Sequence, residues 1–482
     1  MVPLLDILQS IPVLGFLPGL VIAFIALFPH SNIGLELAAI LMIFTGQVWN
    51  MTFSFYRSLQ TIPNELKEVA KIYRFNWWQR FTKLELPFST MGLVWNSMMS
   101  MAGGWFFLSI SEAFILGDKD FRLPGIGSYM SVAIQTGNLP AMIYAIIAMS
   151  LMIIAVDQLF WKPIVAWAQK FKFDDTEAAQ TPTSKLLEVL QSSHVLLFFR
   201  KSIFHPTYKL LLKLFSFFST KTNNQKYQSQ FKILTSLLFW LFRTVIFGIV
   251  AFALYKLIFL LSSVNLKEWV SIFIDLILTF FRVFAAVVIG SLWTIPAGVA
   301  IGMNAKLSKI FQPVIQVVAS FPAPMLFPIV LLILIKLGGS IEYGSILLMM
   351  LGTQWYILFN VIAGAMAIPS DLREVASINR LTKYQYYKRL ILPAIFPFLV
   401  TGWVTASGGA WNASIVAEYV HFGSDILIAT GLGSKITLAT DNANFGVLAA
   451  SVIAMSTTVV MVNRIFWKRL YKLAEERFSM SK

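Results

Sequence analysis

The sequence predicts an all-α polytopic membrane protein built from two tandem helical bundles. Its composition is 57% hydrophobic and 13% charged, with a mean hydropathy of +0.72, whereas soluble domains carry about 25% charged residues. Ten apolar runs are each long enough to cross about 30 Å of hydrocarbon. A long internal duplication relates the two halves of the chain. Together these observations exclude an ordinary soluble domain.

The apolar runs fall into a group of four and a group of six. This division predicts about ten transmembrane helices, four in the first copy and six in the second. The run at 272–303 is long for one span, and we expect Gly290, Pro296 and Gly298 to kink it. The ten runs are 11–28, 34–56, 88–112, 141–161, 233–261, 272–303, 313–337, 341–367, 394–416 and 443–465.

The duplication is clearest in a polar block that occurs at 62–87 and again at 368–393. The two blocks are identical at 12 of 26 positions. The offset of 306 residues continues beyond them, as in Trp49 and Trp355 (355 − 49 = 306). The further matches are Gly103/Gly409, Trp105/Trp411, Glu112/Glu418, Gly125/Gly431, Gly127/Gly433 and Trp161/Trp467. This is a tandem duplication of a whole membrane domain.

The copies predict three regions: a first domain at 1–170, a linker at 171–232 and a second domain at 233–482. Met1 aligns near Phe311, so nothing in the first copy corresponds to 233–310. Either the first copy is shortened at its N-terminal side, or residues are missing before Met1. A two-fold assembly favours matched halves, and we therefore expect a missing segment.

The linker has two parts. Residues 173–185 are polar and predict a flexible tether. Residues 195–218 mix aromatic and basic side chains, which is typical of a helix lying in the headgroup region. A plain spacer explains them equally well.

Charge predicts the orientation of the chain. Residues 161–232 hold eleven Lys or Arg against four Asp or Glu, and the C-terminal segment is also basic. The positive-inside rule therefore places the two polar blocks, the linker and the C-terminus in the cytoplasm. The net charge of +15 has the same origin, so no nucleic-acid partner is expected. Cysteine is absent and the four histidines are scattered, so no metal site is expected.

The polar block is predicted to fold as two short helices at the membrane surface. Pro63 and Pro369 suit a helical first turn, and Leu66, Val69 and Ala70 recur at helical spacing. An amphipathic loop without a partner is the alternative. Its repetition in register favours a structure that fits two equivalent sockets on a two-fold partner.

These residues resemble the EAA loop of ABC-importer permeases, which docks on the cytoplasmic ATPase. The resemblance implies coupling roles for Glu68, Ala70, Arg74, Pro87, Glu374, Ala376, Arg380 and Pro393. The family pattern has a glycine where Arg74 and Arg380 stand. A left-handed residue there would strain arginine. Asn379 could take that role in the second copy, whereas Tyr73 is a poor candidate in the first.

A second group of candidates lies at the end of the next apolar run of each copy. They are candidates for the translocation path or a gate: Trp105, Ser109, Glu112, Trp411, Asn412 and Glu418. Helix packing through Gly103 and Gly409 is the favoured explanation of the glycine–tryptophan pairs. Intramembrane carboxylates are usually functional, but the two glutamates would cost little at the outer interface. The motifs Gly125-Ile126-Gly127 and Gly431-Leu432-Gly433 resemble a short glycine signature of the same permease family. Turn formation explains these glycines equally well.

The resemblance implies a MetI-like transport component without catalytic residues, in the bacterial inner membrane. More narrowly, the chain resembles fused double permeases of the nitrate, sulfonate and taurine type. The expected partners are two ATPase subunits that bind ATP and magnesium, an extracytoplasmic binding protein and the lipid bilayer. The alternatives are an ATP-independent transporter or channel, a membrane enzyme, which no catalytic set supports, and an inactive permease remnant.

Overall fold

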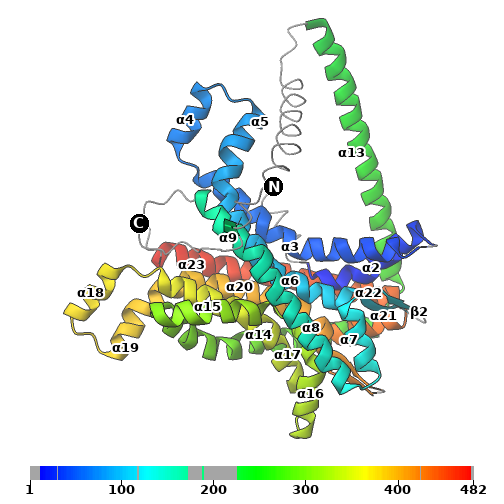
Figure 1. The fold of residues 1–482 in the computed structure, drawn as a ribbon. Helices are drawn as coiled ribbons and strands as arrows, with labels where there is room; N and C mark the ends of the chain where they lie inside the picture. The colour runs from blue at the N-terminus through cyan, green and yellow to red at the C-terminus, as the bar shows by residue number, and fades with distance from the viewer. Residues whose placement is uncertain are drawn as a thin grey trace. The chain divides into compact units, whose positions relative to one another are not determined.

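The computed structural model describes residues 11–29, 31–116, 119–171, 187–188, 225–423 and 425–478, and most of them are helical (Figure 1). Every predicted apolar run folds as a helix or as a bent pair of helices. The predicted all-α class is thereby confirmed. The predicted tether at 173–185 and the interfacial helix at 195–218 lie outside the described residues.

From α2 and α16 onward, the two copies repeat the same order of elements. The first copy contains α2 (Val13–Leu27), α3 (Ile33–Thr61), α4 (Asn64–Ile72), α5 (Trp77–Arg80), α6 (Leu86–Ser111), β1 (Ala113–Leu116), β2 (Lys119–Arg122), α7 (Ile126–Gln135), α8 (Leu139–Val156) and α9 (Lys162–Ala168). The second contains α13 (Gln225–Ser262), α14 (Leu266–Gly302), α15 (Ala305–Ser320), α16 (Phe327–Lys336), α17 (Ile341–Met366), α18 (Ser370–Ile378), α19 (Lys383–Tyr386), α20 (Leu392–Ala417), β3 (Tyr419–Phe422), β4 (Asp425–Ile428), α21 (Leu432–Asp441), α22 (Phe445–Val462) and α23 (Lys468–Phe478).

Fewer helices than expected meet the requirements of a membrane span. Seven described helices are long and apolar enough, and a bent pair raises the number to eight, against the ten predicted. The 15 residues of α2 extend only about 22 Å at 1.5 Å per residue. The 26-residue α6 is long enough, but serine, threonine and asparagine interrupt its apolar run.

The bent pair corrects the expectation of one span at 313–337. The axis turns by 78° between α15 and the segment Ala323–Lys336. Phe321 is extended, with φ −70° and ψ 132°, because the following Pro322 disfavours a helical conformation in the residue before it. By contrast, α14 stays helical through Pro296.

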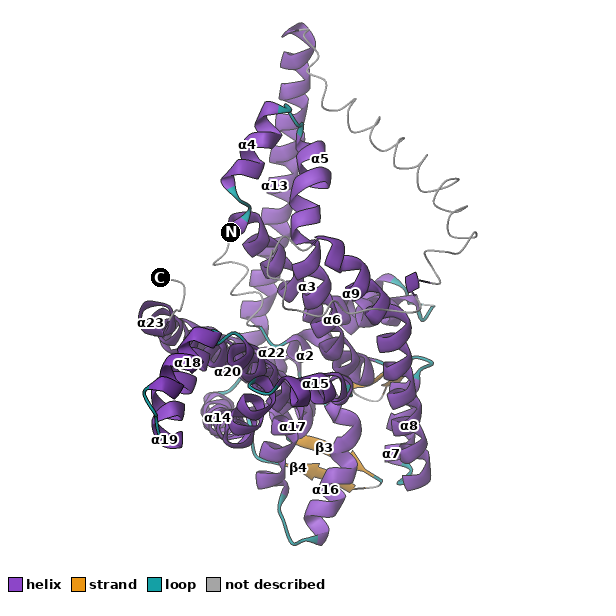
Figure 2. Ribbon diagram, turned by 60° about the vertical axis from the view of Figure 1, so that its left-hand side comes forward, coloured by secondary structure: helices purple, strands orange, loops and turns teal. Residues whose placement is uncertain are grey.

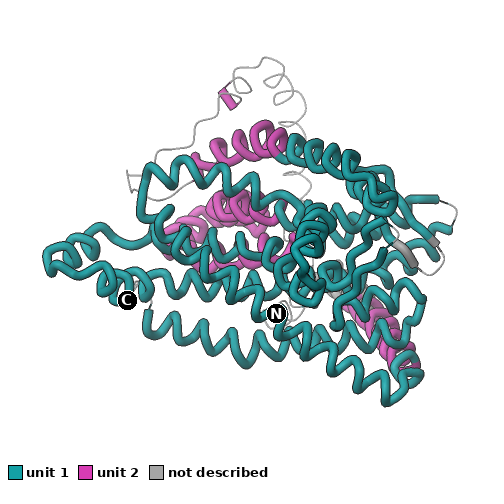
Figure 3. The backbone as a smooth tube through the Cα atoms, turned by 90° about the horizontal axis from the view of Figure 1, so that it is seen from below, with its two compact units in different colours: residues 1–46, 102–153, 260–482 teal, residues 47–101, 154–259 magenta. Residues whose placement is uncertain are grey.

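The chain forms two compact units (Figure 3). Unit 1 comprises 1–46, 102–153 and 260–482, and unit 2 comprises 47–101 and 154–259. Unit 2 holds the loop formed by α4 and α5, whereas unit 1 holds its counterpart formed by α18 and α19. The domain boundaries at 170 and 232 stay a prediction from the duplication.

The core of unit 1 is a three-helix layer in which α17 packs against both α14 and α20. Figure 2 shows these three helices grouped together. Small residues permit this packing, since a Cβ at Gly298 would lie 2.7 Å from Val361 and one at Gly302 would lie 2.7 Å from Ala365. Both α21 and α23 then pack on α20. This packing holds the C-terminal end of α20 in place. Glu418 and strand β3 follow directly after that end.

Two short hairpins occupy equivalent places in the copies. Strand β1 pairs with β2 in antiparallel register from Ala113–Arg122 to Leu116–Lys119. Strand β3 pairs with β4 from Tyr419–Ile428 to Phe422–Asp425. Each hairpin joins a long helix to a ten-residue helix, α7 or α21. It therefore returns the chain to the carboxylate that follows the long helix.

Candidate functional site

The two predicted loops have the same backbone geometry although they belong to different units. Helices α4 and α18 have nine residues each, and both follow an extended proline with ψ 144°. A capping box then starts α5 from Asn76 and α19 from Thr382. These caps satisfy the free N–H groups at the helix ends, so each loop is a defined two-helix structure.

The turn between the two helices shows which residue takes the left-handed conformation in place of the family glycine. Arg74 and Arg380 adopt left-handed conformations, with φ of 50° and 47°. The following N–H groups donate to Ala70 and Ala376 across 3.0 and 3.2 Å, which closes a Schellman motif. Asn379 has a φ of −76°, so the expectation that it could be the left-handed residue is wrong. The turn therefore has the left-handed residue at the position of the family glycine. Arginine adopts that conformation there although it is unfavourable for a residue with a side chain.

The surface of each loop exposes apolar side chains at matching positions. Ile72 is 76% exposed and its counterpart Ile378 is 73% exposed, while Ala70 and Ala376 are buried. Glu68 and Glu374 are exposed on the same helices. The predicted apolar face is thus divided, because Ala70 packs inward and Val69 points to solvent. Paired exposed isoleucines are costly without a partner surface.

Each loop continues directly into the next long helix. A π-helical turn spans Phe81–Glu85 in the first copy and Tyr387–Ile391 in the second, with no break before α6 or α20. Pro87 and Pro393 lie in the first turn of those helices. The 26 residues of α20 extend about 39 Å. The loop and Glu418 therefore lie at opposite ends of one rigid element.

At that far end, a glutamate in each copy caps the short helix that follows the hairpin. Glu112 accepts a hydrogen bond of 2.5 Å from the Gly127 N–H. Glu418 accepts one of 2.8 Å from the Gly433 N–H. A negative charge at a helix N-terminus is favourable. The candidate carboxylates are thus anchored to the helix ends and do not point freely into a path.

The glycines of the two Gly-x-Gly motifs leave the space that these carboxylates occupy. A Cβ at Gly127 would lie 2.9 Å from Glu112 Oε2, and one at Gly431 would overlap the Glu418 carboxylate. Gly431 itself is extended, with φ −174°, so no unusual backbone angle requires a glycine there. Close approach of the glutamate, more than turn formation, explains the repeated Gly-x-Gly motif.

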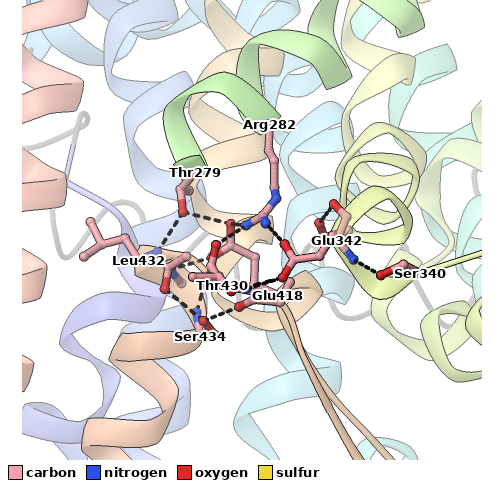
Figure 4. A network of polar contacts seen from close by, with 12 residues as sticks. Thr279, Arg282, Ser340, Glu342, Glu418, Thr430, Leu432 and Ser434 are labelled. Carbon is pink, nitrogen blue, oxygen red and sulfur yellow. Dashed lines mark hydrogen bonds and ion pairs between the residues drawn. The ribbon is translucent and has the colours of Figure 1, made fainter. Parts of the chain in front are cut away.

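The second copy adds a cation to this arrangement (Figure 4). Arg282 of α14 donates to Glu418 at 3.0 Å and to the Thr430 carbonyl at 2.8 Å. Its other terminal nitrogen pairs with Glu342 of α17. Thr279 donates to Glu418 at 2.8 Å. Burial raises the pKa of Glu418, and Arg282 and Thr279 oppose that shift.

The described part of the first copy has no counterpart of Arg282 beside Glu112. Burial raises the pKa of Glu112, the backbone hydrogen bonds of Gly127 and Ser128 oppose that shift, and the negative charge of Glu36 adds to it. Among the described residues no ion pair involves Glu36 or Glu112. The same motif therefore gives an ion-paired site in one copy and an unpaired acid in the other.

The remaining path candidates are mainly buried. Trp411 is 1% exposed and Trp105 is 8% exposed, which agrees with helix packing. Ser109 donates to the Phe106 carbonyl within its own helix, and Asn412 accepts a hydrogen bond of 3.4 Å from the Leu14 N–H.

A cavity of about 260 Å³ within unit 1 is lined by residues of both copies. Ser109 lines it, together with residues of α2, α7, β3 and α21. Tyr419 donates to Asp441 at 2.7 Å beside it, and burial lowers the pKa of His421. Its lining contains no lysine or arginine, so it carries no fixed cation for an anionic solute.

Sequence reasoning missed the residues that bind the second-copy acid. Asp275 and Arg282 stand out as the main charges within an apolar run, yet their partners are not local. Asp275 pairs with Lys435 at 2.5 Å. The sequence did contain one signal that could have found Glu342. The offset of 306 residues relates Glu342 to Glu36, which makes them a second duplicated pair of acids in addition to Glu112 and Glu418.

Comparison with known proteins agrees with these features. The bicarbonate transport system permease protein CmpB of Synechococcus elongatus is 30% identical over 129 residues, which are 27% of this chain and 45% of that protein. The nitrate import permease protein NrtB of Synechocystis is 30% identical over 142 residues, 30% of this chain and 49% of that protein. The putative aliphatic sulfonates transport permease protein SsuC of Bacillus subtilis is 26% identical over 129 residues, 27% of this chain and 45% of that protein.

The chain spans about half the length of these curated relatives. A broader match comes from the family of binding-protein-dependent transport system inner membrane components, whose pattern covers 1–160 and again 290–477. The two matched segments coincide with the two copies of the duplication and make up well over half of the chain. This protein therefore belongs to that family of inner-membrane transport components, in a duplicated form.

Proposed function

We propose that the chain forms the transmembrane pathway of an ABC importer, with both coupling loops on one polypeptide. The observation that carries the proposal is the matched pair of two-helix loops, each with an exposed isoleucine and glutamate at the same positions. Two separate ATPase subunits, which bind ATP and magnesium, dock on α4–α5 and α18–α19. An extracytoplasmic binding protein delivers the solute to the opposite end of the bundle.

The solute is proposed to be a small anion. The support is the naming of the relatives as nitrate, bicarbonate and aliphatic sulfonate permeases. The outer cavity has no cationic lining residue, so recognition of the anion is assigned to the binding protein. The loops and the basic helix α23 face the cytoplasm of a bacterial cell in this proposal, following the positive-inside rule.

The loops act as levers because each is continuous with a long helix. Closure of the ATPase dimer on ATP moves α18–α19, and α20 carries that movement about 39 Å to the outer end. The ligand that shifts the conformational equilibrium is thus bound by a partner and not by this chain. The buried charge pairs lie at the end of α20 remote from the loop, where they brace helices.

The decisive experiment changes the loop surface without changing its interior. We expect Ile378→Asp and Glu374→Arg to abolish co-purification of the ATPase and ATP-dependent uptake, because both side chains are exposed. The control is Leu337→Asp, which replaces an 80% exposed leucine outside the loop. Uptake should be measured in proteoliposomes with the binding protein and nitrate or bicarbonate.

Normal ATPase binding by both loop variants would refute the coupling assignment. Uptake that persists without ATP in the unmodified complex would instead favour an ATP-independent transporter. An intact complex that hydrolyses ATP but moves no solute would favour an inactive remnant.

A further inference from the structure

In the second copy, one stripe of α17 is the surface on which α14 packs. Glu342 at its start pairs with Arg282 of α14. Eight residues on, Met350 lies 3.5 Å from where a Cβ at Gly290 would stand. Gln354, one further turn along, accepts a hydrogen bond of 3.0 Å from the Trp293 indole. These residues are spaced by helical turns and define the contact face of α14.

The first copy keeps this stripe, and within unit 1 the stripe is uncovered. With the offset of 306, Glu342, Ile346 and Met350 correspond to Glu36, Ile40 and Phe44 of α3. Ile346 and Met350 are partly buried against the core, whereas Ile40 is 59% exposed and Phe44 is 52% exposed. Glu36 is also exposed. An acidic and apolar stripe with a known occupant in one copy therefore stands open in the other.

The second acid of the arginine site is kept as well. Glu112 corresponds to Glu418 and holds the same bond to its Gly-x-Gly helix. Glu36 lies close enough to Glu112 for its negative charge to affect the titration of that carboxyl group. In the second copy the equivalent pair, Glu342 and Glu418, shares one guanidinium. The second copy thus shows that a guanidinium group can pair with both carboxylates of this site.

We propose that the stripe Glu36–Ile40–Phe44, together with Glu112, binds an apolar transmembrane helix from outside the described residues, whose arginine occupies the place that Arg282 has in the second copy. The partner helix is apolar, with the arginine paired to both carboxylates. Small residues two turns beyond the arginine fit against Phe44, as Gly290 fits against Met350. This inference does not depend on the transported solute.

Lipid is a poor occupant of this stripe. Acyl chains cover isoleucine and phenylalanine well, but they offer no cation to Glu36 and Glu112. A lone cation in solution satisfies the acids and leaves Ile40 and Phe44 bare. A helix that carries arginine on an apolar face satisfies both requirements at once, which is how α14 meets them in the second copy.

The absence of cysteine from the sequence allows a direct test by site-specific cross-linking. Ile40→Cys, labelled with a benzophenone maleimide, is irradiated in native membranes, and the adducts are mapped by mass spectrometry. The expected product joins position 40 to an arginine-containing membrane helix from outside the described residues. The matched control is Leu151→Cys on α8, an apolar position with 62% exposure that is not part of the stripe. That control should give lipid adducts only.

Charge dependence then identifies the contact. We expect Glu36→Gln with Glu112→Gln to lower the yield of the adduct at least tenfold, while the exposed Glu65→Gln leaves it unchanged. A synthetic α14 peptide, 266–302, serves as a second probe in nanodiscs. It should bind to the unmodified chain at least tenfold more tightly than its Arg282→Leu form.

Several outcomes would overturn the proposal. Adducts to lipid alone would show that the stripe faces the bilayer. A cross-link within the same chain, to α13 and its Arg243, would show that this chain covers its own stripe. An adduct whose yield ignores both carboxylates, or equal binding of the two peptides, would remove the role of the arginine.

Discussion

The two outer carboxylates, Glu112 and Glu418, start from the same sequence motif and end in different environments. Both cap a ten-residue helix through a Gly-x-Gly segment fifteen residues downstream. Glu418 is fully buried and holds Arg282, whereas Glu112 is partly exposed and has no cation among the described residues. The helix cap is therefore a local property, and the ion pair is a property of the bundle.

This difference separates two kinds of stabilisation. The cap forms within one short stretch of chain, so duplication copies it faithfully. The ion pair needs α14, which is 136 residues away from Glu418 along the sequence. Removing Arg282 should therefore leave Glu418 without a cation, as Glu112 is among the described residues. Because Glu418 is buried and Glu112 is partly exposed, the loss of stability should be larger in the second copy.

The largest effect is expected for Arg282→Leu. The variant leaves Glu418 buried and unpaired, which should lower the free energy of unfolding by about 3–5 kcal/mol. Adding Glu418→Gln should restore part of that loss, because the buried charge is removed. The measurement is reversible unfolding in lipid–detergent micelles. An equally large loss for Glu112→Gln would break the contrast between the copies.

A smaller effect is expected where the glycines admit the carboxylates. Gly433→Ala places a Cβ against the Ser414 carbonyl oxygen, and Gly127→Ala places one 2.9 Å from Ser109 O. We expect each to cost about 1–3 kcal/mol, with Gly433→Ala the more severe. Gly408→Ala is the control, since nothing lies within 4 Å of its added Cβ. Thermal unfolding of the three variants under one condition checks the order.

The smallest effect concerns the pH dependence of the unpaired acid. Burial raises the pKa of Glu112 above its ordinary value of 4.5, so the folded state holds that proton more tightly than the unfolded state. The stability contributed by Glu112 is therefore present at low pH and is lost as pH rises through the raised pKa. The wild type should lose stability relative to Glu112→Gln over that range. A flat difference in melting temperature would contradict the assignment.

The coupling loops show how far the sequence could predict structure. The bounds of both two-helix loops, their prolines and their attachment to α6 and α20 follow from the repeated block. The choice of Arg74 and Arg380 as left-handed residues did not follow from residue preference, which favours asparagine. It followed from the Schellman bonds to Ala70 and Ala376, whose geometry fixes the left-handed position at the second residue after the helix.

The apolar runs show a similar division. Their length and composition predicted the long helices, because burial of apolar residues in a bilayer depends on local composition. They did not predict the ten-residue helices α7 and α21. The bend of 78° after α15 was missed although Pro322 and Pro324 are visible in the sequence. A proline identifies where a helix can break, but packing of the flanking segments sets the angle.

The sequence by itself determined the helical class, the duplication and the two loops, since these depend on residues within about one or two turns or on direct repetition. Only the tertiary structure decided which helices share a surface. Arg282 meets Glu342 and Glu418 across 60 and 136 residues, and no local preference encodes such a meeting. It arises because α17 packs against both α14 and α20, where a buried charge is stable only beside its partner.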